Sequence, residues 1–123
     1  MANKIIVTTG DFSSPYEVLG LVYFQVSNVG VFSNHYDMLT ETYEPRIADW
    51  LQKGLMTAVK KGMFGGISYY SFEASFYIGV EELKRKCRSL GGDAVICVRE
   101  DMDVLDGGNF AVQMYGTAVR FVR

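Results

Sequence analysis

The stretch GVEELKRKCRSLGGDAVICV, residues 79–98, contains the transition from a helix to a strand. Its apolar residues recur every three or four positions as far as Leu90, which is the spacing of one helix face. Gly91 follows and can adopt the left-handed backbone conformation that ends many helices. From Ala94 onward, β-branched residues typical of strands take over. The stretch therefore predicts a helix that stops at Gly91 and leads into a strand.

The other elements follow from the same patterns. The helical period extends back to Phe72, so the predicted long helix covers residues 72–90. Runs rich in Val, Ile, Tyr and Phe predict four strands, at residues 4–9, 16–31, 93–102 and 109–122. The last two strands are joined by a loop with Asp106, Gly107 and Gly108, which is typical of a hairpin.

An extra helix is expected in the 45–62 region. Its apolar residues have helical spacing, Pro45 suits a first helical turn, and Gly62 suits the end of the helix. The following segment, GMFGGIS, is expected to be a linker. At 123 residues and 49% hydrophobic content, the whole chain, residues 1–123, fits one compact domain. The predicted fold is α+β, β-β-α-β-β, with an antiparallel sheet packed on helices.

The composition argues against several partners. Nucleic-acid binding requires a concentrated basic surface. The net charge of -2 and the pI near 5.3 argue against such a surface. No segment approaches the ~20 apolar residues of a membrane span, and the first residues do not form a signal peptide. We therefore expect a cytoplasmic protein that binds neither nucleic acid nor membrane.

The strands are apolar on both faces. In the last strand, Val112 and Met114 alternate with Tyr115 and Val119, although a strand with one face in water should alternate apolar with polar residues. Two helices could cover both faces of a small sheet. A contact between subunits is the alternative that we favour, and these four residues are then candidates for the oligomer interface.

Several motifs resemble those of a known family. They are VTT at residues 7–9, the Y-x-x-x-G-x-V element of Tyr16, Gly20 and Val22, Asn34, LGGDAVICV at residues 90–98, and GTAVRFV at residues 116–122. Together they resemble the YbjQ-like family of small bacterial proteins, which are labelled heavy-metal binders. The resemblance implies a β-α-β-β core like that of the dodecin subunit, with an extra N-terminal strand, assembled as a homopentameric ring.

The candidates for the metal ligands that the family label implies are Cys87 and Cys97. They are the only cysteines, they form no CxxC pair, and they fall on the apolar stripe of the helix and inside an apolar strand. Packing in the core explains both better than metal ligation. The one histidine, His35, is expected in a loop with Asn34 and Asp37, as a solvated side chain. No metal site and no cofactor is predicted.

The predicted long helix carries a basic cluster, formed by Lys84, Arg85, Lys86 and Arg88. Glu81 and Glu82 precede Arg85 and Lys86 by four positions, the favourable order for ion pairs along a helix. A solvated helix face therefore explains the cluster better than an anion site.

The chain lacks a recognisable nucleophile motif, and no enzymatic activity is expected. Aromatic residues crowd the region 36–77, where they pack either in the core and interface or around a planar ligand. The candidates for a ligand wall are Trp50, Tyr69, Tyr70 and Phe72. Two functions remain open: a non-enzymatic oligomeric scaffold or interaction protein, and a module that binds a planar small molecule at subunit junctions.

Overall fold

The protein is described by a computed structural model covering residues 4–30, 33–61, 66–69, 71–104 and 109–123. Its elements, in chain order, are β1 (Ile6–Val7), β2 (Tyr16–Ser27), α1 (Ser33–Thr42), α2 (Glu44–Gln52), β3 (Ala58–Lys61), β4 (Gly66–Tyr69), α3 (Ser71–Ser89), β5 (Ala94–Val104) and β6 (Phe110–Phe121). The predicted α+β class is confirmed. So is the order of two strands, a long helix and two strands, with additional helix before α3.

Four strands form one sheet in the order β1-β5-β6-β2. The β5–β6 hairpin is confirmed by its antiparallel register, in which Val104 pairs with Phe110; the loop with Asp106 to Gly108 lies outside the described residues. The sheet is mixed rather than wholly antiparallel, because Ile6 and Val7 pair in parallel with the start of β5. The N–H groups of Ile6 and Thr8 hold this short pairing by donating to the carbonyls of Asp93 and Val95. The direction of β1 depends on these long-range contacts, so the strand pattern did not reveal it.

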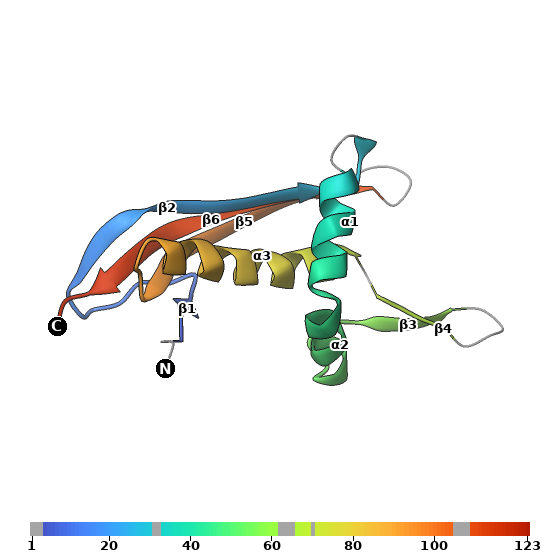
Figure 1. The fold of residues 1–123 in the computed structure, drawn as a ribbon, viewed down its shortest axis with the longest axis horizontal. Helices are drawn as coiled ribbons and strands as arrows, with labels where there is room; N and C mark the ends of the chain where they lie inside the picture. The colour runs from blue at the N-terminus through green and yellow to red at the C-terminus, as the bar shows by residue number, and fades with distance from the viewer. Residues whose placement is uncertain (1–3, 31–32, 62–65, 70, 105–108) are drawn as a thin grey trace.

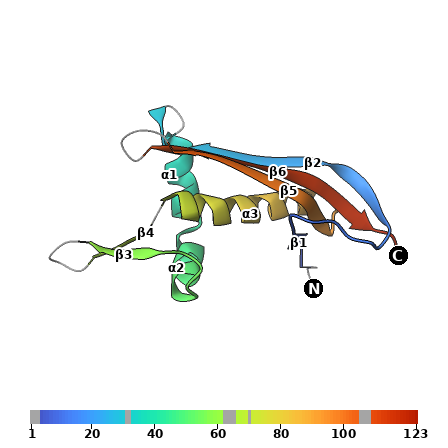
Figure 2. The same cartoon turned by 180° about the vertical axis from the view of Figure 1, so that it is seen from behind.

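Helix α3 lies along one face of the sheet, and Figures 1 and 2 show it beneath β2, β5 and β6. It contributes Ile78, Leu83 and Cys87, all at most 1% exposed, to the core. The sheet supplies Phe24 and Met114 opposite them. This packing uses the apolar stripe that the sequence indicated.

The end of α3 has the predicted geometry. Gly91 adopts φ +78°, the N–H of Gly91 donates to the carbonyl of Arg88 at 3.0 Å, and the N–H of Gly92 donates to that of Cys87 at 2.9 Å. These two hydrogen bonds form a Schellman motif, which satisfies carbonyls that the helix itself leaves unpaired.

The extra helix differs from its predicted bounds. It ends at Gln52, where Gly54 at φ +75° forms a second Schellman motif: Gly54 and Leu55 donate to the carbonyls of Leu51 and Trp50. The segment predicted as its second half instead forms β3, and part of the predicted linker forms β4; residues 62–65 lie outside the described residues. The glycine that ends the helix is thus Gly54 rather than Gly62.

Two further elements were not predicted. Residues 33–42 form α1, so Asn34, His35 and Asp37 lie in a helix and not in a loop. Only Leu39 of α1 is buried, which leaves too weak an apolar stripe for detection. The antiparallel β3–β4 hairpin projects away from the sheet and α3 in both views (Figures 1 and 2).

Among the described residues, the second face of the sheet is covered at one end only. The segment before β2 places Phe12 there, 5.1 Å from the ring of Phe121 in an edge-on contact, over buried Val119. Farther along the same face, Leu21, Tyr23 and Tyr115 are 78%, 61% and 46% exposed. We call these three residues the open-face patch. The helices therefore do not cover both faces.

Candidate functional site

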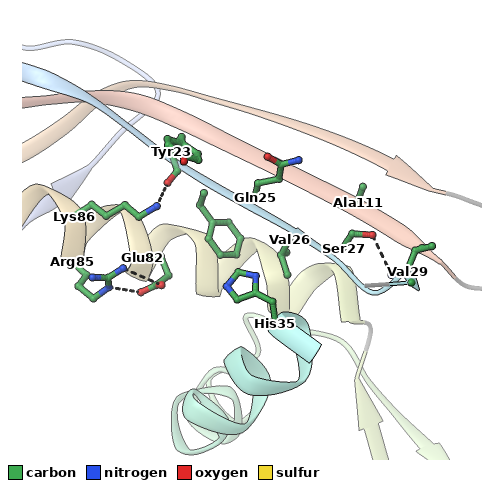
Figure 3. A pocket seen from close by; sticks show the side chains of 12 residues that line it. Tyr23, Gln25, Val26, Ser27, Val29, His35, Glu82, Arg85, Lys86 and Ala111 are labelled. Carbon is green, nitrogen blue, oxygen red and sulfur yellow. Dashed lines mark hydrogen bonds and ion pairs between the residues drawn. The ribbon is translucent and has the colours of Figure 1, made fainter. Parts of the chain in front are cut away.

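A cavity of about 750 Å³ lies along the outer edge of β2, between this strand and the helices α1 and α3 (Figure 3). It is lined by Tyr23, Phe24, Gln25, Val26, Ser27, Val29, Gly30, His35, Glu82, Arg85, Lys86 and Ala111. We call it the edge cavity. Five consecutive residues of β2 line it because β2 is the last strand of its sheet, and no strand of the described part of the chain lies on its outer side.

Lys86 occupies one end of the edge cavity. Its ammonium group donates to the main-chain carbonyl of Tyr23 and lies 4.6 Å from the centre of the Tyr23 ring, a cation–π contact. Among the ion pairs of the described residues, Lys86 has no carboxylate partner. No ion pair of the described residues therefore offsets its charge beside the cavity, and with three N–H donors it can form further hydrogen bonds.

The neighbouring carboxylate, Glu82, is already neutralised. Arg85 Nε donates to Glu82 Oε2 at 2.8 Å, and the Tyr43 hydroxyl donates to the same oxygen at 2.9 Å. Burial favours the protonated form of Glu82, but these hydrogen bonds outweigh it and lower the pKa of Glu82. Burial and the hydrogen bond to Glu82 raise the pKa of Tyr43 to about 12. The pair Glu82–Arg85 thus carries no net charge.

The remaining lining is mainly apolar. Phe24 and Val26 are each 3% exposed, and Val29 and Ala111 are half-buried. His35 points from α1 toward β2 in Figure 3. The edge cavity therefore combines an apolar wall with one uncompensated cation, and its volume falls in the range of small-molecule sites, roughly 300–1,000 Å³.

The predicted aromatic wall is not assembled around this cavity. Trp50 is buried, 5.5 Å from the ring of Tyr77, with the guanidinium of Arg46 5.8 Å from its own ring. Phe72 is half-buried against the core, Tyr69 belongs to β4, and Tyr70 lies outside the described residues. The described aromatic side chains of this group pack in the core and do not line the edge cavity.

The two cysteines occupy different environments. Cys87 is fully buried and its thiol lies 3.4 Å from the carbonyl of Ala94, as a donor; burial raises the pKa of the Cys87 thiol. Cys97 is exposed at an irregularity of β5 and has φ +55°, unusual for a residue other than glycine. A raised pKa opposes the thiolate that a soft metal needs. The described residues contain no group of three or more His, Cys, Asp or Glu side chains placed to hold a metal ion.

The four residues predicted for the oligomer interface lie in different environments, three of them buried and one exposed. Val112 and Met114 are buried in the core with α3, and Val119 is buried in the smaller cluster on the second face. Tyr115 is exposed and belongs to the open-face patch. Three of the four thus already have cover within one chain.

Sequence reasoning missed the edge cavity and its cation. The expected ion pairs four residues apart, Glu81 to Arg85 and Glu82 to Lys86, are replaced by pairs three apart: Lys84 lies 3.4 Å from Glu81, and Arg85 lies 2.8 Å from Glu82. This change leaves Lys86 to contact Tyr23 across 63 positions of sequence. The basic cluster of α3 was the signal in the sequence for this site, but the sequence did not show that β2 lies beside the cluster.

The fold defines a class of small two-layer α+β proteins, in which a long helix covers one face of a four-stranded sheet. The chain belongs to the YbjQ_1 family, described as "Putative heavy-metal-binding", whose model matches residues 48–122. This confirms the resemblance drawn from the motifs. The descriptions of the family and of the relatives below name no enzymatic activity.

Two proteins are similar to this chain over nearly its whole length. A UPF0145 protein of Lacticaseibacillus casei is 28% identical over 127 residues, covering 99% of each chain. A crystal structure of a DUF74 family protein of unknown function from Pediococcus pentosaceus has a TM-score of 0.56 at 17% identity, covering 96% of this chain and 98% of that one. This structural likeness supports the fold alone. Among the described residues, no helix combines the length and apolar character needed to cross a membrane.

Proposed function

We propose that the protein is a non-enzymatic binding protein that associates with copies of itself. The observation that carries this proposal is the open-face patch. Leu21, Tyr23 and Tyr115 lie together because Tyr23 pairs directly with Tyr115 across β2 and β6, and Leu21 is two residues away along β2. Large apolar groups gathered on one face are typical of an interface, whereas single exposed apolar residues are common on monomers.

The free edges of the sheet support the same proposal. Among the described strands, β2 has no neighbour on its outer side, and β5 pairs beyond residue 98 only with β6. Free edges at opposite sides of a sheet allow a head-to-tail contact, and such a contact closes into a ring when the rotation fits. We propose a cyclic homo-oligomer, and the family resemblance predicts five copies.

The test is the mass in solution measured by light scattering after size-exclusion chromatography. Five copies of the 13.8 kDa chain give about 69 kDa. We expect Leu21→Glu and Tyr115→Glu to lower this mass, because a charge placed in a buried apolar contact lacks a partner. The control is Val122→Glu, at a residue that is 64% exposed outside the patch. A stable oligomer should persist at protein concentrations on the order of tens of micromolar. A wild-type protein with a mass of 13.8 kDa under these conditions contradicts the proposal.

The second candidate function is small-molecule binding, and the edge cavity is the observation that favours it. Its wall is built by Phe24, Val26 and His35 rather than by the aromatic residues that the sequence suggested. Because Tyr23 belongs both to this cavity and to the open-face patch, association would place a neighbour beside the cavity. Denaturing the purified protein and analysing the released small molecules by mass spectrometry tests this function directly.

Heavy-metal binding is not the function that the described residues support. Cys87 is buried, and neither Cys87 nor the exposed Cys97 has, among the described residues, the additional ligands that a soft-metal site requires. The family description therefore gains no support from the side chains that the structure describes.

A further inference from the structure

We propose that the edge cavity binds a small organic anion, a molecule with a carboxylate or phosphate group and a flat apolar body, and that Lys86 holds its charged group. The proposal rests on the second function above, small-molecule binding, and adds the chemical class of the ligand. It is carried by the position of an uncompensated cation at one end of an apolar cavity.

The charge balance of the lining favours an anion. Its charged side chains are Glu82, Arg85 and Lys86, and the first two neutralise each other at 2.8 Å. Lys86 therefore determines the sign of the charge at this end of the cavity. A cationic ligand would have to displace Arg85 from Glu82, which also accepts the Tyr43 hydroxyl at 2.9 Å.

Lys86 is also held in place. Its contacts with the carbonyl and the ring of Tyr23 fix the ammonium group at the edge of β2 (Figure 3). A side chain that is already ordered loses less conformational entropy when it binds a ligand than a freely moving lysine would. The N–H groups not used by Tyr23 remain available for a carboxylate or phosphate oxygen.

The rest of the cavity suits the apolar part of such a ligand. Phe24 and Val26 form one wall, and the half-buried Val29 and Ala111 extend it away from Lys86. His35 stands on the α1 side and offers both a flat ring and a hydrogen-bonding nitrogen. An anion without an apolar body would leave the half-buried Val29 and Ala111 in contact with water.

The test uses the full-length protein and four probes measured by isothermal titration calorimetry: 2-naphthoate, 2-naphthyl phosphate, neutral 2-naphthalenemethanol and inorganic phosphate. We expect the two naphthyl anions to bind roughly tenfold or more tightly than the neutral alcohol, since an ammonium group bonds more strongly to an anionic oxygen than to a neutral hydroxyl. Inorganic phosphate should bind more weakly than 2-naphthyl phosphate, and the stronger of the two naphthyl anions identifies the preferred charged group. Amide NMR shifts should change at residues 23–27 and at Ala111.

Substitutions in α3 test whether Lys86 is the cation that binds the anionic group. Lys86→Gln should weaken binding of the naphthyl anions roughly tenfold and leave the neutral alcohol unchanged, while Lys86→Arg should keep most of the affinity. The matched control is Lys84→Gln, since Lys84 pairs with Glu81 and does not line the cavity. If Lys86 only stabilises the edge of β2, Lys86→Gln will change the melting temperature and not the preference for anions, which overturns the proposal.

The remaining outcomes separate the two levels of inference. Equal affinity for the anions and the neutral alcohol overturns the anion assignment and leaves small-molecule binding standing. Failure of all four probes to bind at millimolar concentration overturns both. Shifts confined to residues away from the edge cavity overturn its role as the site.

Discussion

Gly79 of α3 lies directly against the ring of Phe24: a Cβ atom at Gly79 would be 2.8 Å from Phe24 Cδ2 and 3.2 Å from Met114 Cε. The absence of a side chain therefore allows the helix to approach β2 and β6 closely. Because Phe24 also forms part of the edge cavity, this contact links core packing to the shape of the candidate site.

Gly79→Ala should destabilise the protein by about 1–3 kcal/mol, because overpacking at this contact outweighs the gain of roughly 1 kcal/mol that alanine brings to an exposed helix position. The measurement is the free energy of unfolding in urea. Arg88→Ala, at an exposed position of the same helix, is the control and should change stability little. A Gly79→Ala variant more stable than the wild type would show that α3 does not approach the sheet this closely.

Gly91→Val should destabilise by about 1–2 kcal/mol, because a β-branched residue resists the positive φ of this helix end. Apart from Gly91 and its two chain neighbours, no atom of the described residues lies within 4 Å of the Cβ position, so the cost arises from the backbone alone. Gly91→Asn should cost less, since asparagine tolerates this conformation better. Thermal unfolding of the two variants tests the order, and equal melting temperatures for valine and wild type contradict it.

The two cysteines should respond differently to serine. Cys87→Ser places a hydroxyl in a fully buried position and should cost about 1–2 kcal/mol, whereas Cys97→Ser at an exposed position should cost less than about 0.5 kcal/mol. Neither change should alter Zn(II) or Cu(I) affinity measured by competition with a chelator. Stoichiometric Zn(II) or Cu(I) binding with a dissociation constant on the order of 1 μM or below, if either variant abolished it, would contradict this expectation.

Tyr43 should make stability depend on alkaline pH. Its pKa is raised to about 12 in the folded protein, so its contribution is fully present below the unfolded value of 10.0 and is lost as the pH rises from there toward the folded value. Because the side chain is only partly buried, we expect about 1 kcal/mol. The free energy of unfolding between pH 9 and 12, compared with that of Tyr43→Phe, isolates this residue. Parallel pH profiles for the two proteins argue against the hydrogen bond to Glu82.

The Glu82 carboxylate acts at the opposite end of the pH scale. Its pKa is lowered in the folded state, so its contribution is present above the unfolded pKa and is lost as the pH falls through the folded pKa. Glu82→Gln should therefore flatten the acid limb of the stability profile, since glutamine does not titrate. Unfolding in urea at stepped acidic pH measures this, and an acid limb identical to that of the wild type would contradict the network with Arg85 and Tyr43.

The sequence by itself determined the unit of α3, β5 and β6. Every signal for it is local: the helical period from Phe72, the left-handed end at Gly91, the apolar strand that follows, and a hairpin loop of turn-forming residues. The same signal at Gly54 was present but outweighed by apolar residues beyond it that continued the helical spacing. Local geometry is readable when one residue type, here glycine, can satisfy it.

Only the tertiary structure decided which surfaces remained available for function. Helix α1 has one buried residue, Leu39, and its position depends on the core that it meets rather than on its own pattern. Lys86 contacts Tyr23 and does not form an ion pair with Glu82, four residues away, because α3 approaches β2 closely. The edge cavity and the open-face patch arise from strand order and one-sided helix cover, and these relationships join residues far apart in sequence. Such long-range contacts have no local signature, which is why the unit of α3, β5 and β6 was predictable and the site was not.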